Sequence, residues 1–251
     1  GLGDGYKRHE FNRLVSGYAS ATSKYFAKEY DDSAAAFKLN EKDIIETGMS
    51  IASKYKDSTS KMHTEIIEIH KKQTICSIKA AHTHFGIHPY YLRICVAPTK
   101  NIDRFEFFLE KAVEMGVNEI IPLQCDNSER SIIKPERLER ICISAMKQSY
   151  KAQKPFIAPI QKCSTILSNK YEGICCIAHC SDSEHKKSLF SHITKGIPTT
   201  ILIGPEGDFS PNEIALAQQN NWTEVHLGTS RLRTETAAIA AVHSVYVKHF
   251  E

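Results

Sequence analysis

The sequence predicts an α/β protein with a mostly parallel sheet, preceded by a small β-rich module. From about residue 90 onward, short apolar runs alternate with segments of helical periodicity, which is the order expected of βα units. Residues 1 to about 40 show no clean periodicity, and between about residues 44 and 78 apolar and polar residues alternate with period two, as in half-buried strands. The pattern changes in a stretch with His, Gly and Pro at residues 80–89, so we expect domains at residues 1–84 and 85–251.

The composition is that of a globular protein. Of its 251 residues, 41% are hydrophobic and 24% are charged, and the formal net charge is +3. No apolar run approaches the roughly 18 residues of a membrane span, so we expect no membrane partner. A net charge this small neither predicts nor excludes nucleic-acid binding. No signal-peptide pattern opens the chain.

The eight cysteines raise the question of a metal site or disulfides. Cys175, Cys176 and Cys180 lie closest together, but no Cys-x-x-Cys pair is present. Because most of the cysteines stand singly inside apolar runs, we expect buried, reduced thiols, no bound metal and a cytoplasmic location. The histidines are also spread out, and we expect His82, His84 and His88 to lie in a solvated linker turn.

The individual elements follow from these patterns. In the first domain, residues 65–69 and 73–78 are predicted strands, and Lys71-Lys72 between them is a hairpin tip. The second domain is expected to contain strands at 91–97, 119–123 and 173–178, an extended run at 156–160, and helices at 103–115, 135–152 and 186–193.

Two strand–loop–helix turns near the C-terminus predict a ligand site. The strand 199–203 meets the tetrapeptide GPEG, after which Ser210-Pro211 caps and opens a helix. The strand 224–227 meets Gly228, and a last helix runs from Thr234 to about residue 250. In an open parallel sheet, ligands bind at such carboxyl-terminal turns. Neither turn is a dinucleotide or phosphate-loop fingerprint, and turn geometry alone would also explain the glycines.

These turns resemble those of the RsmE family of ribosomal RNA methyltransferases, which belongs to the SPOUT class. The resemblance rests on GPEG followed by FS at 204–210 and on LRTETA at 232–237, with consistent matches over about residues 90–251. Upstream matches include the stretches 100–106, 110–117, 128–131 and 145–149. This sequence departs from the family pattern at Asp208, where a third glycine is usual, at Ser230, where an arginine is common, and at Lys151, where an arginine often stands.

The resemblance implies a fold, an activity and partners. The C-terminal domain would be a SPOUT trefoil knot that binds S-adenosylmethionine, and the N-terminal domain a PUA-like barrel that holds RNA. The enzyme would methylate N3 of a uridine in 16S ribosomal RNA, acting on that RNA or on the small ribosomal subunit, as a homodimer. A non-catalytic RNA-binding protein of the same fold, or a small-molecule enzyme that uses a nucleotide in the same pocket, remain alternatives.

The resemblance also assigns site residues. The cofactor contacts would come from Leu202, Gly204, Glu206, Gly207, Leu227, Gly228, Leu232, Thr234 and Ala237. Uridine N3 must lose its proton before it can attack the methyl group, and a nearby cation would stabilise the resulting anion. We expect Arg233 first and Arg104 second in that catalytic role. Glu206 or Glu235 would accept the proton, although glutamates at helix N-termini often cap amides instead.

RNA contacts are expected from four cations: Arg104, Arg130, Lys147 and Lys151. Lys147, Lys151 and Lys154 are spaced by four and three residues, so on a helix they would form one basic stripe. Lys111 and Glu114 would share the helical face of Arg104. For both faces, a solvated and salt-bridged surface is the alternative explanation.

Overall fold

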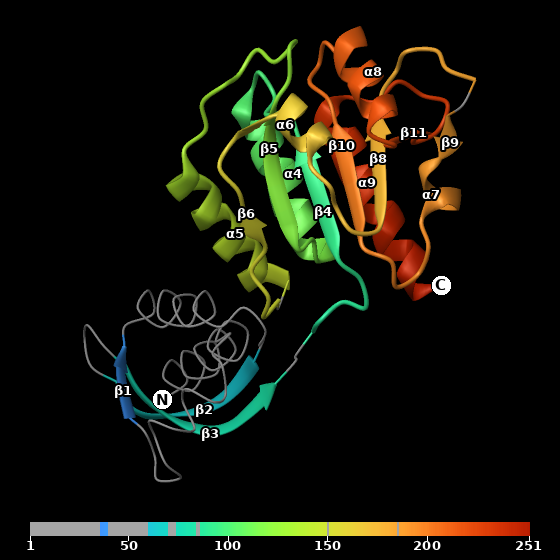
Figure 1. The fold of residues 1–251 in the computed structure, drawn as a ribbon. Coiled ribbons are helices and arrows are strands. Elements are labelled where there is room, and N and C mark those ends of the chain that lie inside the picture. The colour runs from blue at the N-terminus through green and yellow to red at the C-terminus, as the bar shows by residue number, and fades with distance from the viewer. Residues whose placement is uncertain (1–35, 40–59, 70–73, 84–85, 150, 185) are drawn as a thin grey trace. The chain divides into compact units, whose positions relative to one another are not determined.

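The computed structural model describes residues 36–39, 60–69, 74–83, 86–149, 151–184 and 186–251 (Figure 1). The chain divides into two compact units. One unit comprises Gly1–Ile87 with Met146–Lys154, and the other comprises His88–Ala145 with Pro155–Glu251.

The described part of the first unit contains a three-stranded antiparallel sheet. β3 (Thr74–Thr83) lies between β1 (Ala36–Leu39) and β2 (Ser60–Ile69). The β2–β3 register shifts twice along the pair, as it does at β-bulges. Residues 65–69 and 74–78 of the alternating stretches therefore fall on strands, whereas residue 73 and the predicted hairpin tip at Lys71-Lys72 lie outside the described residues.

The second unit is built on a parallel sheet with the strand order β6-β5-β4-β10-β8-β11-β9, and β7 also pairs with β5. Its strands are β4 (Leu92–Val96), β5 (Glu119–Gln124), β6 (Phe156–Ile157), β7 (Gln161–Lys162), β8 (Ile174–Ala178), β9 (Lys187–Ser188), β10 (Thr199–Ile203) and β11 (Thr223–His226). Each described pairing in this unit is parallel. The predicted α/β class with a parallel sheet is therefore confirmed.

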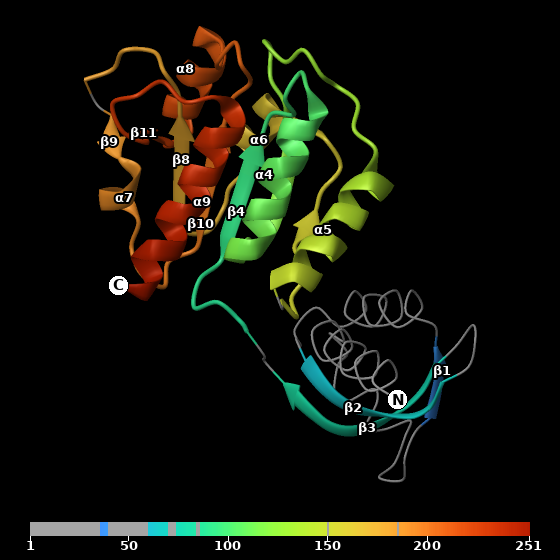
Figure 2. The same cartoon turned by 180° about the vertical axis from the view of Figure 1, so that it is seen from behind.

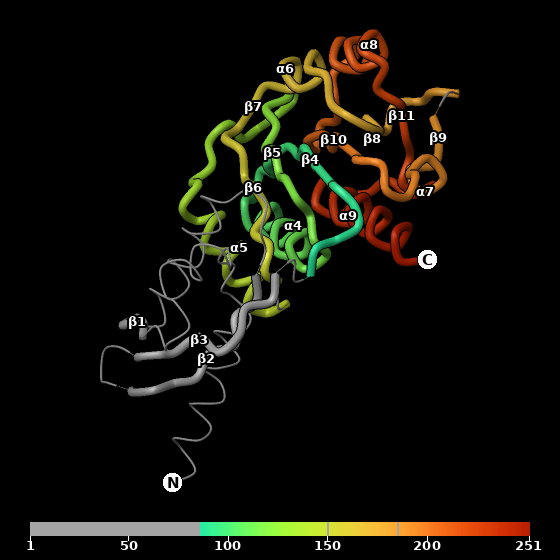
Figure 3. The backbone as a smooth tube through the Cα atoms, turned by 60° about the horizontal axis from the view of Figure 1, so that its bottom comes forward, coloured from blue at the N-terminus to red at the C-terminus, as the bar shows by residue number. Residues whose placement is uncertain are grey.

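Helices cover both faces of this sheet. α4 (Ile102–Met115) and α9 (Thr234–Phe250) lie together on one face, and α6 (Cys163–Ser168) and α8 (Pro211–Gln219) lie on the other (Figures 1 and 2). The chain leaves β11 near one edge and returns to the middle of the sheet, where α9 packs against α4, β4 and β10 (Figure 3). This return path brings the start of α9 next to the end of β10.

The strands contribute to both hydrophobic layers because successive side chains point to opposite faces. Cys95 of β4, Ile177 of β8 and Leu202 of β10 are fully buried and join the cluster that packs on α6 and α8. Trp222 closes that cluster, and its indole N–H donates to the Leu167 carbonyl at 3.1 Å. The central strands are thus fixed on both faces, which gives the loops at their ends a rigid base.

The boundaries of α4 are set by local chemistry. The Asn101 side chain accepts a hydrogen bond from the amide of Asp103, and the helix ends at Gly116 with φ +89°. A Cβ atom at Gly116 would lie 1.8 Å from His88 Nε2, so the position needs glycine for space as well as for its backbone angle. His88 is half-buried and stacks on Tyr90, and His82 lies on β3, so the predicted solvated turn is wrong for both. His84 lies outside the described residues.

Two predicted helices differ from the observed ones. α5 (Pro135–Ser149) ends before Lys151 and Lys154, so the helical spacing that would align these lysines with Lys147 does not exist. The predicted helix 186–193 is instead the edge strand β9 followed by the short α7 (Leu189–His192). β9 forms because it pairs with β11, a contact distant in sequence that local periodicity cannot indicate. α6 and β7 were not predicted, and the extended run 156–160 contains only β6.

The cysteines behave mainly as core residues. Of the described ones, five are buried, namely Cys95, Cys125, Cys142, Cys163 and Cys176, and all are free thiols. Burial raises the pKa of Cys176 to about 12, which keeps that thiol protonated. Cys180 is exposed, and Cys76 lies on β3, where side chains are not described. Among the described segments, no helix is both long and apolar enough to cross a membrane.

Candidate active site

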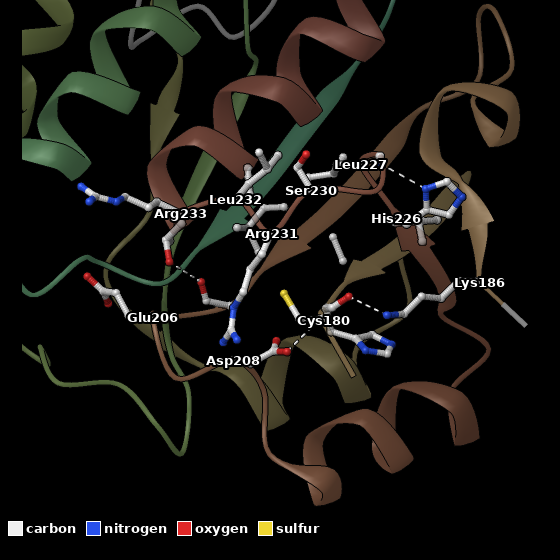
Figure 4. Close-up of a pocket in the computed structure, with 18 of the residues that line it drawn as sticks. Cys180, Lys186, Glu206, Asp208, His226, Leu227, Ser230, Arg231, Leu232 and Arg233 are labelled. Carbon is white, nitrogen blue, oxygen red and sulfur yellow. Dashed lines mark hydrogen bonds between the residues drawn. The ribbon is translucent and has the colours of Figure 1, made fainter. Parts of the chain in front are cut away.

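A cavity of about 670 Å³ lies at the carboxyl ends of three neighbouring parallel strands, β10, β8 and β11 (Figure 4). Its wall is formed by three loops: the one after β8, the GPEG turn after β10, and the connection from β11 to α9. The first residues of α9, Thr234 and Ala237, complete the lining. The two turns predicted to form a ligand site are therefore adjacent in the folded chain.

The GPEG turn is held by contacts within the protein. A Cβ atom at Gly204 would lie 3.0 Å from two ring carbons of the buried Phe209. A Cβ atom at Gly207 would lie 3.1 Å from the Cβ of Asn127. Both glycines are therefore needed for close packing around the turn. Packing within the protein is therefore enough to explain these two glycines, without a contact to a cofactor.

Asp208 ties the GPEG turn to the loop after β8. Its φ of +64° lies in the left-handed region, which explains why glycine is usual at this position and why an aspartate is tolerated there. Its Oδ2 accepts a hydrogen bond from the Cys180 amide at 2.7 Å, and its Oδ1 accepts one from the Phe209 amide at 2.9 Å. One carboxylate thus fixes two walls of the pocket.

The helix after this turn begins as predicted. Ser210 and Glu213 form a reciprocal capping box, and Pro211 stands at the first helical position. Glu213 also approaches Cys125 and Cys163, and possible ligand atoms of these three residues lie within 4.8 Å of one another. Both carboxylate oxygens of Glu213 already accept amide hydrogen bonds, one from Asp126 at 3.1 Å and one from Ser210 at 2.8 Å. A hydrogen bond to Cys125 and burial raise the pKa of the Cys163 thiol, so this cluster fits protonated thiols.

The second turn meets the first at the start of α9. The buried hydroxyl of Thr234 donates to the Gly204 carbonyl at 3.1 Å and so joins the two predicted turns directly. Gly228 has φ +125°, and a Cβ atom there would meet open space. Glycine is needed at position 228 for its backbone angle, not for room. The Gly228 amide donates to His226 Nδ1 at 3.3 Å.

The two arginines of the β11–α9 connection point in different directions. The exposed Arg233 is the N-cap residue of α9 and makes no side-chain capping bond. In Figure 4, Arg233 points away from the cavity on the side of α4, whereas Arg231 points into the cavity toward Asp208. Neither guanidinium has a hydrogen-bond or ion-pair partner among the residues that the structure describes. Arg231 was not among the predicted site residues.

Arg104 and Glu235 form a loose pair outside the cavity lining. Arg104 Nε lies 3.9 Å from Glu235 Oε1, and the other carboxylate oxygen of Glu235 is buried with no hydrogen-bond partner among the described residues. Glu235 is therefore directed at Arg104 and not at Arg233. The exposed Glu206 lines the cavity, and its Oε1 accepts a hydrogen bond from the Lys100 amide at 3.0 Å.

Most of the predicted cofactor residues line the cavity: Gly204, Glu206, Leu227, Gly228, Leu232, Thr234 and Ala237. Two do not. Leu202 is fully buried in the layer beneath α6 and α8, because alternate residues of β10 face opposite sides of the sheet. Gly207 lies against Asn127 at the outside of its turn. Arg233 and Glu206 line the cavity among the predicted catalytic residues, and Arg104 does not.

The predicted RNA-binding cations have several environments. Arg130 donates to the carbonyls of Thr99 at 3.1 Å and Lys100 at 2.8 Å, so its guanidinium holds the loop before α4. Lys147 and Lys151 belong to the other unit and are half-buried, and burial lowers the pKa of Lys151. On α4, Lys111 bonds to Glu110 at 2.7 Å and Glu114 at 2.8 Å, so that part of the helix face is salt-bridged.

The loop after β8 supplies site residues that the sequence analysis missed. His179 is buried beside the cavity, and its Nε2 lies 2.8 Å from Glu224 Oε2. Burial and the nearby Lys186 lower the pKa of His179, so the ring is neutral and donates to the carboxylate. Burial alone would raise the pKa of Glu224, but hydrogen bonds from Gln218 and His179 lower it. The predicted strand end at Ala178 was the available signal, because loops after parallel strands carry ligand sites.

The chain is similar to known RNA methyltransferases over the unit that contains the cavity. Residues 87–246 match the profile of the RNA methyltransferase domain family. A ribosomal RNA small subunit methyltransferase E from Mesomycoplasma hyopneumoniae is 34% identical over 154 residues, which are 59% of this chain and 65% of that protein. Curated relatives of this name are matched over 60% to 66% of their own length.

Solved structures of similar fold extend the match to most of the chain. A "probable rRNA-methyltransferase" from Porphyromonas gingivalis has a TM-score of 0.73 and 31% identity, with 90% of each chain covered. A ribosomal RNA small subunit methyltransferase E from Neisseria gonorrhoeae, solved with S-adenosyl methionine bound, has a TM-score of 0.67 and 22% identity. That alignment covers 90% of this chain and 88% of the other.

Proposed function

We propose, from the premise that the chain belongs to the RNA methyltransferase domain family, that it transfers the methyl group of S-adenosylmethionine to N3 of a uridine in 16S ribosomal RNA. The observation that carries the proposal is the position of the cavity. Each of its lining residues falls within 87–246, the span that matches the family profile, and two of its three loops are the turns whose motifs resemble the RsmE family. Its substrate would be the RNA alone or the small ribosomal subunit.

The cavity residues fit a nucleoside that carries a charged amino-acid group. Its volume of about 670 Å³ lies within the range of ligand sites, about 300–1,000 Å³. Leu227, Leu232 and Ala237 offer apolar surface for a base, and the backbone of the two turns offers amides and carbonyls. Asp208 and Arg231 add one charge of each sign. S-adenosylmethionine bound there would supply an electrophilic methyl group.

The protein would act mainly by alignment and electrostatics. An in-line methyl transfer needs a positioned nucleophile, and uridine N3 becomes nucleophilic only when it loses its proton. Arg233 would stabilise the uridine anion formed in this step, because its guanidinium is exposed and has no partner in the described chain. The positive end of the α9 dipole lies at the same place and would add to its field. Glu206 is the proposed proton acceptor, and Arg104 a second cation near the base.

Further features of the family belong to the same proposal. A trefoil knot is supported by the return of the chain from β11 to the middle of the sheet and by the bond from Thr234 to Gly204. A PUA-like barrel in residues 1–84 is supported by the antiparallel sheet β1-β3-β2. We also propose a homodimer in which a second copy covers the cavity, and a cytoplasmic location.

Binding and transfer can be tested separately. Titration calorimetry with S-adenosylmethionine measures the first, and transfer of a labelled methyl group to small ribosomal subunits that lack this modification measures the second. We expect both, with the label recovered as N3-methyluridine after nuclease digestion. Binding without transfer to any subunit or RNA would favour a non-catalytic RNA-binding protein. The absence of binding would refute the proposed function.

A further inference from the structure

Of the two arginines in the cavity lining, Arg231 is the one that points into the cavity, and nothing in the described chain neutralises its charge. Arg231 lies in the connection between β11 and α9, is exposed, and points into the cavity (Figure 4). It makes no hydrogen bond and no ion pair with any residue that the structure describes. A guanidinium directed into a ligand pocket without a protein partner is available for an anion of the ligand.

The other cations of the cavity are occupied or point elsewhere. The Lys186 ammonium donates to the carbonyls of His179 at 2.8 Å and Ser181 at 2.5 Å, which fixes the loop after β8. Arg233 points away from the cavity (Figure 4). The His179 ring is neutral because burial lowers its pKa, and its Nε2–H is used by Glu224. Among the arginines and lysines of the described lining, Arg231 is therefore the one that a ligand inside the cavity can reach.

Arg231 is not needed to neutralise the charge of Asp208. The two side chains are on the same side of the cavity in Figure 4, but they form no ion pair. Each carboxylate oxygen of Asp208 already accepts a backbone amide hydrogen bond, from Cys180 and from Phe209. Asp208 would hold its position without any help from the arginine. Arg231 thus has no structural task in the described part of the molecule.

We propose that Arg231 binds the α-carboxylate at the amino-acid end of S-adenosylmethionine, an inference that rests on the proposed function. That cofactor carries one carboxylate, and its adenosine part carries no negative charge. A planar guanidinium can hold a carboxylate through two parallel hydrogen bonds, which fixes orientation as well as charge. The contact would orient the sulfonium end of the cofactor without touching the base. Arg231 would then be a positioning residue for the methyl group.

The test compares two ligands that differ by the amino-acid group. S-adenosylhomocysteine keeps the carboxylate, and 5′-methylthioadenosine keeps the nucleoside and thioether but lacks the amino-acid group. Both are titrated by calorimetry into the full chain and into Arg231→Ala and Arg231→Lys. Arg140→Ala is the matched control, because Arg140 is an exposed arginine on α5 that lies outside the cavity lining and has no partner in the described chain.

We expect Arg231→Ala to weaken S-adenosylhomocysteine binding by about ten- to a hundredfold and 5′-methylthioadenosine binding by less than about twofold. Arg231→Lys should restore part of the loss, since a lysine keeps the charge without the planar fork. Arg140→Ala should match the unmodified chain with both ligands. Equal weakening of both ligands by Arg231→Ala, or no weakening of either, would overturn the assignment.

Two further outcomes separate this inference from the proposed function. If the unmodified chain binds neither nucleoside, the proposed function fails and the inference fails with it. If the chain binds both and Arg231→Ala changes only the affinity for RNA and its salt dependence, the arginine contacts a phosphate of the RNA instead. In that case only the assignment to the cofactor carboxylate is refuted.

Discussion

Replacing Gly228 by alanine tests whether the shape of the second turn, and not free space within it, forms the ligand site. A methyl group at position 228 meets no other atom, so a steric clash cannot cause any effect. The backbone angle φ of +125° is one that residues with a Cβ atom rarely adopt, and keeping it costs about 1–3 kcal/mol. The turn would relieve that strain by changing its path along the cavity wall.

Gly196→Ala is a matched control for this substitution. Gly196 also has a positive φ, +77°, and open space around a Cβ atom, but it lies in the turn before β10 and does not line the cavity. Its expected strain is about 1–2 kcal/mol. Both variants should melt a few degrees lower, at about 2–4 °C per kcal/mol for a chain of this size. Only Gly228→Ala should lose affinity for S-adenosylmethionine, and we expect a loss of tenfold or more.

In Gly204→Ala, unlike in Gly228→Ala, the added methyl group would meet a close neighbour. Its methyl group would lie 3.0 Å from the ring of the buried Phe209, so the variant should lose about 1–3 kcal/mol of stability through overpacking. Thermal melting and titration calorimetry on the three variants distinguish these causes. If Gly228→Ala melts lower but binds the cofactor normally, or if Gly196→Ala loses binding to the same extent, the geometric explanation is refuted.

Arg233→Lys should lower the rate of single-turnover methylation by about a hundredfold or more, because a lysine cannot reproduce the planar donors that would stabilise the uracil anion. The affinity for the cofactor should stay within a few-fold. A near-normal rate would remove Arg233 from the catalytic residues. His179→Gln should flatten the loss of melting temperature on acidification. The folded state lowers the pKa of His179 below its ordinary value near 6.5, so the unfolded chain binds the proton at a higher pH than the folded chain does. The stability that the neutral His179 contributes is therefore lost as the pH falls below about 6.5. An unchanged pH profile in His179→Gln would contradict the lowered pKa of His179. In denaturant titrations, Asp208→Ala should lower the free energy of unfolding more than Asp208→Gly. Both variants lose the bond to Cys180, but only glycine removes the cost of the +64° backbone angle. Equal losses would show that the backbone angle costs nothing.

The central strands could be predicted because their signals are local. The runs at 199–203 and 173–178 are apolar and short and end next to turn residues, and both are strands with these bounds or within one residue of them. β9 could not be predicted in the same way. Lys187-Ser188 forms a strand only because it pairs with β11, which lies nearly forty residues further along the chain. The hydrophobic pattern of that region favoured a helix, and the tertiary contact overrode it.

Of the three glycines predicted at the site, Gly204 and Gly228 line the cavity and Gly207 does not, and the physical reason for each glycine could not be predicted. The sequence does not show that Phe209 folds back over Gly204 or that Asn127, from a distant loop, packs on Gly207. It also does not show which glycine has a positive φ. A single departure from the family pattern was informative, because an aspartate in place of glycine marks a left-handed position that Asp tolerates, and Asp208 occupies it.

The two arginines of the second turn show most directly where sequence reasoning ends. Residues two apart in an extended segment point the same way, so an Arg-x-Arg pattern before a helix suggests two cations in one site. In the folded chain, however, α9 begins at Thr234, and Arg233 becomes its N-cap residue, with a backbone direction set by the helix. Arg231 precedes that constraint and points into the cavity instead (Figure 4). If Arg233 serves the uracil and Arg231 the cofactor carboxylate, one short connection would place a cation on each side of the reacting methyl group, and the charge of each could be removed without moving the other.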